Sequence, residues 1–270
     1  MNTLSRSIFR PLARSAASLA GLMSLVVLTG CAHSPPSDPW DPLEPVNRVT
    51  YKFNDQADKY LLRPVAKGYD TITPDFVQKG VTNFFDNASQ PVTMVNSLFQ
   101  LKWGKFNQSL GRFMINTTAG VGGLVDVASM TDVPHPDEDF GQTLGYWGVG
   151  PGMYIYLPFL GPSDGRDLIG TGVDQFANPI SYLNEFDEID DNYSYLPYVL
   201  RAIQGVNLRA SLLGFDSTLA QQFDPYAFIR SYYLENRQKA VYDGDVPASL
   251  QAADDVGNFP ATSSASPDSN

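Results

Sequence analysis

The sequence begins with an apolar run that ends at the only cysteine of the chain. Arg6, Arg10 and Arg14 are the only charged residues before this cysteine, and Ala16 to Leu28 is apolar apart from two serines and a glycine. A basic segment, a short apolar segment and a site of small residues are typical of a secretory signal that is removed after export. A membrane-spanning helix needs roughly 20 apolar residues, which is more than this run offers. We therefore expect residues 1–30 to be a signal peptide that takes no part in the fold.

Cys31 makes this signal more specific. Leu28-Thr29-Gly30-Cys31 resembles the lipobox of bacterial lipoproteins, in which the cysteine sulfur receives a diacylglycerol and the preceding peptide is cut. The alternative is an ordinary free or buried cysteine, which the charge, the apolar run and their spacing disfavour. Several acyl chains on one residue would anchor the chain stably to a membrane. With one cysteine in the chain no intramolecular disulfide can support the fold.

Composition divides the remaining chain into three parts. Residues 31–39 are short and proline-rich, which is typical of a tether, and residues 40–242 are long enough to bury a sizeable core. Residues 243–270 are rich in Ala, Ser, Asp and Pro and contain no lysine or arginine, so we expect a disordered acidic tail. Without the signal peptide the chain has 15 basic and 29 acidic residues, a net charge of −14. This charge argues against a nucleic-acid partner and against electrostatic binding to anionic membranes.

The body of the chain is predicted to be mostly α-helical. Apolar residues recur at helical spacing in several segments, and prolines and glycines separate these segments. The expected helices run from Pro45 to Leu62 with a stop before Arg63-Pro64, from a cap at Thr73-Pro74 past Ala88, from Pro91 to Leu101, from Phe106 to Thr117, from a cap at Ser163 to about Asn178, from Pro197 to Leu213, and from a cap at Asp224-Pro225 past Tyr233.

One segment does not fit a regular helix. Residues 146–162 read YWGVGPGMYIYLPFLGP, which is both aromatic and rich in glycine and proline. Met153 to Leu157 is predicted to be a strand of a hairpin. Because aromatic side chains are costly to expose to water, the segment is expected to pack on the helices or to lie in lipid.

Catalytic and metal-binding patterns are weak in this sequence. The two histidines, His33 and His135, have no ligand partner at metal spacing, and no Gly-x-Ser-x-Gly motif is present, so we expect no enzyme, no metal and no cofactor. Asp137-Glu138-Asp139 is compatible with a calcium ion, but a solvated acidic loop is favoured. Residues 148–152, GVGPG, are better explained by a tight turn than by a phosphate-binding loop. A pair of carboxylates for glycan hydrolysis stays open, since the fold rather than the spacing would bring them together.

Several motifs of the body together resemble one known family, the MlaA (VacJ) lipoproteins. The resemblance covers Asp41 to about Gln238. The motifs are Asp41-Pro-Leu-Glu-Pro-Val-Asn-Arg48, Arg63-Pro-Val-Ala66, Asn83-Phe-Phe85, Pro91-Val-Thr-Met-Val-Asn96, Arg112-Phe-x-x-Asn-Thr117, Gly120-Val-Gly-Gly-Leu-Val-Asp-Val-Ala128, Phe140-Gly-Gln-Thr-Leu-Gly145, Gly148-Val-Gly150, Leu157-Pro-Phe159, Arg166-Asp167 and Asp224-Pro-Tyr226.

The resemblance implies a function and a shape. MlaA proteins are outer-membrane lipoproteins that remove phospholipids misplaced in the outer leaflet and pass them to a periplasmic carrier of the MlaC type. Their fold is an α-helical ring that lies in the bilayer beside a trimeric porin and contains an amphipathic channel. The resemblance places Gly148 and Gly150 at a hairpin next to this channel, whose movement would gate the entry of lipid; a static tight turn is the alternative. Ala32, directly after the lipidated cysteine, implies sorting to the outer membrane.

Two hypotheses of other classes compete with lipid transport. One is a structural lipoprotein that holds the layers of the envelope together, and the other is an envelope hydrolase that uses carboxylates. Bound phospholipid would favour transport, whereas turnover of a glycan would favour the hydrolase. The sequence identifies no porin, no head-group preference and no direction of lipid flow.

Overall fold

The computed structural model describes residues 41–185 and 195–248, and this part of the chain is mostly helical. The signal peptide, Cys31 and the tether lie outside the described residues. The elements are α2 Glu44–Ala57, a π-helical turn η1 Asp58–Leu62, α3 Arg63–Ile72, α4 Asp75–Phe99, α5 Trp103–Thr118, α6 Phe140–Tyr146, β1 Tyr154–Leu157, β2 Gly161–Asp164, α7 Gly165–Asp174, α8 Leu196–Ser211, α9 Asp216–Ala220 and α10 Pro225–Val241, with the 3₁₀ turns η2 Ser129–Thr131, η3 Pro179–Glu185 and η5 Leu213–Phe215.

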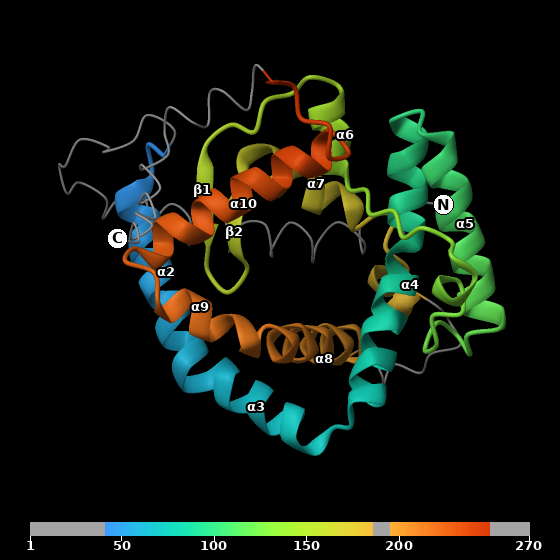
Figure 1. Cartoon of the computed structure of the whole chain (residues 1–270), viewed down its shortest axis with the longest axis horizontal. Helices are drawn as coiled ribbons and strands as arrows, with labels where there is room; N and C mark the ends of the chain where they lie inside the picture. Colours follow the sequence, from blue (N-terminus) through green and yellow to red (C-terminus); the bar gives the residue numbers. More distant parts are fainter. Residues whose placement is uncertain (1–40, 186–194, 249–270) are drawn as a thin grey trace, which may run out of the picture.

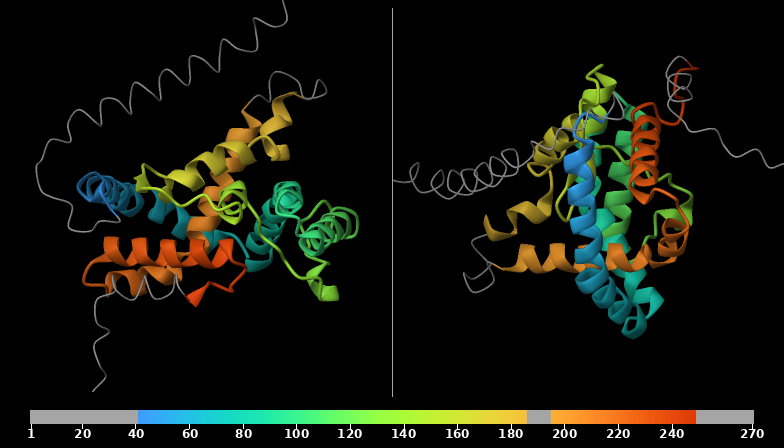
Figure 2. Two further views of the ribbon diagram at one scale, coloured as in Figure 1. Left: turned by 90° about the horizontal axis from the view of Figure 1, so that it is seen from above. Right: turned by 90° about the vertical axis from the view of Figure 1, so that its left-hand side faces the viewer.

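The helices follow one another round the periphery of the molecule. In Figure 1, α2 lies on the left and α3 runs along the lower edge, α8 lies above α3 with α9 to its left, α4 and α5 form the right side, and α6 and α10 the top. Figure 2 shows that α10 lies in a separate layer, over one face of the part that contains the β-hairpin and α7. The expected mostly α, ring-like arrangement is therefore confirmed. None of the helices in the described ranges combines the length and the apolar character that crossing a membrane requires.

A cluster of tyrosines forms the hydrophobic core where α2, β1 and α10 meet. Tyr154, Tyr156 and Tyr226 are buried, and Tyr51 and Tyr233 pack against them. Their rings make edge-on or tilted contacts at centroid distances of 5.6 Å (Tyr51–Tyr156) and 5.9 Å (Tyr154–Tyr233), which are favourable geometries for aromatic pairs. This core holds α2, the β-hairpin and α10 together.

The prediction that the first helix stops before Arg63 is wrong. The chain passes from α2 through the π-helical turn into α3, and the N–H of Arg63 donates to the carbonyl oxygen of Asp58, five residues back. Pro64 has no N–H, and its ring would clash with the carbonyl four residues earlier in an ordinary α-helix. A wider turn before Pro64 removes this conflict, so the helix continues with a local bulge.

Pro91 does not start a helix, contrary to the prediction. It lies inside α4, which runs without interruption from Asp75 to Phe99. Next to the proline, Ser89 Oγ and Gln90 Nε2 donate to the carbonyl of Asp86 at 2.8 and 3.2 Å and so add hydrogen bonds within this turn of the helix. A proline inside a helix costs about 3 kcal/mol. The packing of α4 on α5, α6 and α8 offsets that cost.

One of the three predicted helix caps is confirmed, and at the other two positions a neighbouring residue precedes the helix. Asp224 caps α10 as predicted, and its carboxylate accepts a hydrogen bond from the N–H of Ala227 at 3.2 Å. Pro74, not Thr73, is the residue before α4. Asp164, the last residue of β2, caps α7 in place of Ser163, because its carboxylate accepts a hydrogen bond from the N–H of Asp167 at 2.7 Å.

The predicted strand is confirmed, and the chain beyond Tyr242 is partly folded. β1 pairs with β2 as an antiparallel hairpin in which Tyr154 is opposite Asp164. After α10 the N–H of Gly244 donates to the carbonyl of Lys239 at 2.8 Å, and the side chain of Asp243 makes two ion pairs. The folded part therefore extends past the expected boundary at Tyr242, because Asp243 has cationic partners in the body.

Candidate functional site

Burial in this protein is inverted relative to an ordinary soluble domain. Within residues 41–185 and 195–248, 19 buried residues are polar or charged and ten are hydrophobic. Interiors of soluble domains are dominated by aliphatic and aromatic residues instead. The largest buried side chains here include Gln100, Glu138, Asn96 and Asp164. Hydrogen bonds and ion pairs between helices thus hold much of the interior together.

The outer surface carries the large apolar side chains. Ile72, Phe76 and Leu160 are 81%, 75% and 78% exposed, and exposed apolar residues occur on every major helix and on the hairpin turn. Hydrating apolar surface costs about 25 cal/mol per Å². Extensive exposure of this kind marks contact with a protein or a membrane. An apolar outside round a polar inside is the arrangement that suits a protein embedded in lipid.

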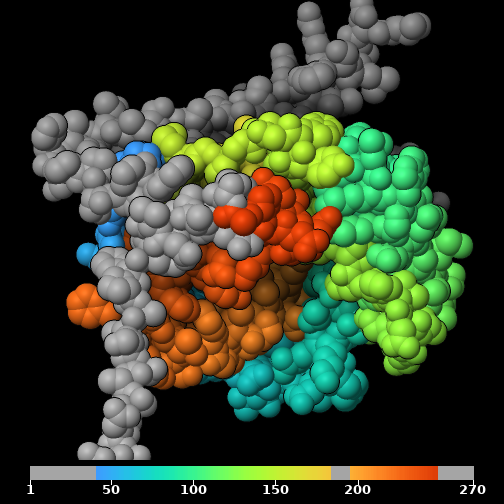
Figure 3. Space-filling model, turned by 45° about the horizontal axis from the view of Figure 1, so that its top comes forward, coloured from blue at the N-terminus to red at the C-terminus, as the bar shows by residue number. Residues whose placement is uncertain are grey.

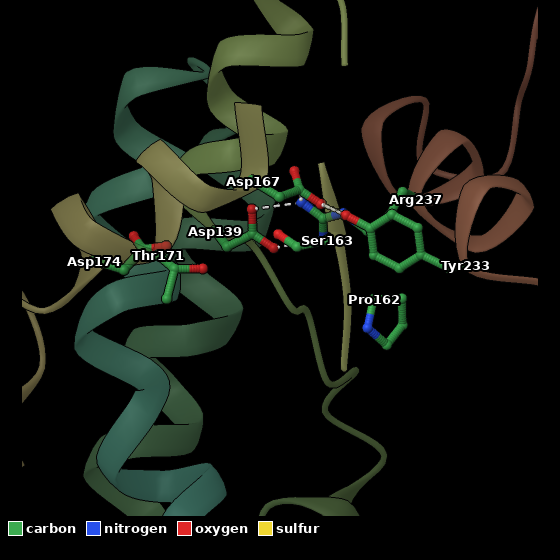
Figure 4. Close-up of a pocket in the computed structure, with 8 residues that line it drawn as sticks. All are labelled: Asp139, Pro162, Ser163, Asp167, Thr171, Asp174, Tyr233 and Arg237. Atoms are coloured by element: carbon green, nitrogen blue, oxygen red, sulfur yellow. Dashed lines mark hydrogen bonds and ion pairs between the residues drawn. The ribbon is translucent and has the colours of Figure 1, made fainter. Parts of the chain in front are cut away.

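A polar cavity lies where α6, β2, α7 and α10 meet. Its volume is about 220 Å³, and Figure 4 shows Arg237 of α10 between the carboxylates of Asp139 and Asp167. Arg237 Nη1 and Nη2 donate to the two oxygens of Asp139 at 2.7 and 3.0 Å, and Nη2 also donates to Asp167 at 2.7 Å. Tyr233 Oη donates to Asp167 at 2.6 Å. The remaining lining residues are Pro162, Ser163, Thr171 and Asp174.

The pKa values of the groups in this cavity reflect a balance between burial and their hydrogen-bond partners. Burial alone would raise the pKa of Asp139, but hydrogen bonds and charge from Arg237 hold it below its ordinary value. Burial raises the pKa of Tyr233, and its hydrogen bond to Asp167 raises it further. Asp174 accepts from Asn96 Nδ2 at 2.8 Å and from the N–H of Phe140, while burial raises its pKa.

Each carboxylate of the cavity therefore has donors from the protein, as expected for a joint between helices. Asp139 also caps α6, since it accepts from the N–H of Gln142 at 2.7 Å. With three carboxylates and one arginine, the cavity does not suit an anionic phosphate. The hydrolase hypothesis gains nothing here, because the carboxylates serve as caps and ion-pair partners. The sequence marked Asp139 in the acidic triplet and Asp167 in the Arg166-Asp167 motif. Tyr233 and Arg237 belong to the last predicted helix, and no sequence pattern marked them as part of a site.

Two asparagines of α2 fix the β-hairpin to the ring. Asn47 Nδ2 donates to the carbonyl of Tyr154 at 3.0 Å, and Asn47 Oδ1 accepts from the N–H of Tyr156 at 2.9 Å. Asn54, two helical turns later, repeats this pattern with the carbonyl of Leu157 and the N–H of Phe159. The two amides thus pair with the outer edge of β1, which would otherwise be open. Asn47 belongs to the first family motif, so the sequence did carry a signal for this contact.

Gly148 and Gly150 lie between α6 and β1, outside the paired strands of the hairpin. Gly148 ends α6: its φ is +89°, its N–H donates to the carbonyl of Gly145, and the N–H of Val149 donates to the carbonyl of Leu144. This is a Schellman cap, which strongly favours glycine. A Cβ added at Gly150 would meet nothing within 4 Å. The two glycines therefore have different structural requirements.

The acidic triplet is not a solvated loop, contrary to the favoured prediction. Glu138 is buried and pairs with Lys102 and Lys105, and Asp139 pairs with Arg237. Glu138 is buried and Asp139 is half-buried because the fold brings basic residues of distant helices to them, whereas Asp137 is exposed. In residues 41–185 and 195–248 no group of three His, Cys, Asp or Glu side chains is placed to hold a metal ion. His135 instead lies 3.3 Å from Gln90 Nε2.

Comparisons with known proteins agree on one family. The family model described as MlaA lipoprotein matches residues 39–240. Proteins named intermembrane phospholipid transport system lipoprotein MlaA are similar: that of Haemophilus influenzae is 34% identical over 88% of this chain and 95% of the relative, and that of Escherichia coli K12 is 34% identical over 83% and 88%. A solved structure, reported as the structural basis for maintenance of bacterial outer membrane lipid asymmetry, has 34% sequence identity and a TM-score of 0.64 and covers 74% of this chain and 98% of that chain.

Proposed function

The chain belongs to the MlaA lipoprotein family, and from this membership we propose that it maintains the lipid asymmetry of the outer membrane. In this proposal it removes mislocalised phospholipids from the outer leaflet through an amphipathic passage. Related proteins are named as components of a phospholipid transport system, which fits a role other than catalysis. The observation that carries the proposal for this chain is the polar interior beneath an apolar surface.

The energetics of lipid removal require such a passage. Extracting a phospholipid exposes two acyl chains to water at about 0.8 kcal/mol per methylene. A lipid with roughly thirty methylenes therefore faces a barrier on the order of 20 kcal/mol if it crosses water unprotected. A protein that moves it must shield the chains and still offer the head group a polar path. Polar side chains inside a ring of helices, with apolar side chains outside, supply both environments.

Attachment and partners are further parts of the proposal. Cys31 would carry the lipid anchor, and the apolar side chains of the helices would embed the body partly in the bilayer, facing the periplasm. A carrier of the MlaC type would receive the phospholipid. A trimeric porin would fix the depth and orientation of a ring that itself lacks a spanning helix in its described residues. These partners rest on the family resemblance.

Deletion of the gene tests the function directly. In cells whose outer-membrane lipid-removing enzymes are also disabled, loss of this protein should increase outer-leaflet phospholipid severalfold and make the cells sensitive to detergents and bile salts. Lipid analysis of the outer leaflet measures the first effect, and a plasmid copy of the gene is the control. An unchanged outer leaflet would remove the transport hypothesis and favour a structural envelope lipoprotein.

We also propose that the segment around Gly148 and Gly150 moves when lipid enters. Gly150→Val should leave protein level and membrane attachment unchanged, because its added side chain has room, yet it should impair asymmetry by restricting the backbone. Gly148→Val should instead destabilise the protein by roughly 1–3 kcal/mol, since it forces a branched residue to a positive φ. Immunoblots of membranes and outer-leaflet lipid analysis separate the two effects. Normal asymmetry with Gly150→Val would identify the segment as a static turn.

A further inference from the structure

The end of α10 is held by Lys102, which directly precedes α5, and by Lys105 in the first turn of α5. Lys102 Nζ donates to Asp243 Oδ1 at 2.7 Å, and Lys105 Nζ donates to the same oxygen. Figure 3 shows the red C-terminal end of α10 beside the green start of α5. Burial alone would raise the pKa of Asp243, but the two ammonium groups hold it below its ordinary value, so this carboxylate is charged at neutral pH.

The same lysines also contact a second carboxylate, which is fixed in the body. Glu138 is fully buried and accepts from Lys102 at 3.1 Å, from Lys105, and from Gln100 Nε2 at 2.7 Å. Asp243 is neither buried nor part of a helix. Its side chain is 38% exposed, and it lies two residues after the end of α10 at Val241. Glu138 is therefore a fixed part of the fold, whereas Asp243 can leave the two lysines and be replaced by another anion.

A cavity of about 470 Å³ adjoins this pair of lysines. Lys105 and Asp243 contribute to its lining together with Gln108, His135, Asp137, Gln142 and Lys239. Besides Lys105 and Asp243, the lining offers amide donors, an imidazole, a second ammonium group and a second carboxylate, which are groups that can pair with the polar parts of a lipid head group. The cavity is about twice as large as the one beside Arg237.

We propose that Lys102 and Lys105 form a binding site for the phosphodiester of a phospholipid head group, and that Asp243 occupies this site in the structure. The proposal rests on the function proposed above. With Asp243 withdrawn, two ammonium groups face the single charge of Glu138, which leaves one positive charge for the one negative charge of a phosphodiester. Lysine ammonium groups are common phosphate ligands. Asp243 acts as an internal competitor, so it lowers the apparent affinity for the head group.

Binding of a soluble head group tests this site. Glycerophosphoethanolamine is titrated into the full-length protein in maltoside micelles and followed by ³¹P NMR. Asp243→Asn should bind it about tenfold more tightly than the wild type, which corresponds to about 1.4 kcal/mol. Asp245→Asn removes the same charge from an exposed position two residues further on, and its affinity should equal that of the wild type.

Loss of the lysines gives the complementary result. Removing them alone would leave Glu138 buried without a cation, so the variant Lys102→Gln/Lys105→Gln/Glu138→Gln removes all three charges together. It should keep its helical circular dichroism and lose head-group binding. Equal affinities of Asp243→Asn and wild type, or full binding by the triple variant, would overturn the proposal.

Two further outcomes separate this site from a general anion site and from the transport function. Inorganic phosphate that binds Asp243→Asn as tightly as the head group does would overturn the assignment to a phosphodiester. A triple variant that fully restores asymmetry to the deletion strain would overturn the site and leave the transport function intact. A deletion strain with normal asymmetry would overturn the transport function itself, whatever the binding data show.

Discussion

Arg237→Gln is expected to lower the free energy of unfolding by about 3 kcal/mol, because it leaves the half-buried carboxylate of Asp139 without a cation and removes the nearer of the two arginines that pair with the buried Asp167. The guanidinium joins α10 to the start of α6 and to α7, so its loss weakens three elements together. For a body of this size the midpoint of thermal unfolding should fall by roughly 6–12 °C. Circular dichroism of the full-length protein in micelles measures the change.

A control on the same helix separates this effect from a general loss of charge. Lys239→Gln breaks the exposed pair with Glu235, and exposed pairs contribute at most about 1 kcal/mol. In an Asp139→Asn background the cost of Arg237→Gln should shrink, since one of the stranded charges is gone. Equal effects of Arg237→Gln and Lys239→Gln would show that the cavity is not a structural joint.

The sequence predicted elements whose signals are local. Asp224-Pro225 caps the last helix as expected, because both the cap and the proline act within one turn. The strand predicted at Met153–Leu157 is confirmed as β1, Tyr154–Leu157. It could be predicted because its alternating aromatic residues lie between glycines and prolines. In both cases the deciding interactions involve residues close in the sequence.

The sequence did not predict features that depend on distant contacts. Pro91 was expected to start a helix, but its packing partners on α5 and α6 keep α4 continuous through it. Glu138 was expected to be solvated, but Lys102 and Lys105 reach it from more than thirty residues away in the chain. No local pattern encodes either pairing.

The candidate site was missed for a different reason. An amphipathic analysis of α4 would place its apolar residues on the buried face, yet Val77 is exposed and the buried residues of α4 are mainly polar, among them Asn87, Gln90 and Asn96. That analysis assumes water outside and a hydrocarbon core inside. This assumption fails in the lipid-embedded arrangement proposed above, in which the polar face is the one that turns inward.

The last prediction concerns Arg112 of α5, which is only 3% exposed. Its Nη2 donates to Asp126 at 2.7 Å, and Asp126 also accepts from Asn116 Nδ2 at 3.0 Å and from the N–H of Ser129 at 3.1 Å. Asp126→Asn should therefore cost about 3 kcal/mol, because it strands a buried cation and loosens the segment after α5. Asp132→Asn, on the same segment, removes an exposed charge and should cost little.

The pH dependence of this cost distinguishes a charge effect from a packing effect. Burial opposes ionisation of Asp126, but hydrogen bonds from Ser129, Asn116 and Arg112 lower its pKa to about 2. An unfolded aspartate has a pKa of about 3.9, so the ionised carboxylate stabilises the fold fully above that pH and loses this contribution as the pH falls towards 2. The difference in unfolding free energy between wild type and Asp126→Asn should therefore shrink across this window, as measured by denaturant unfolding at each pH. A difference that stays constant from pH 7 to pH 2 would assign the cost to packing and not to the ion pair.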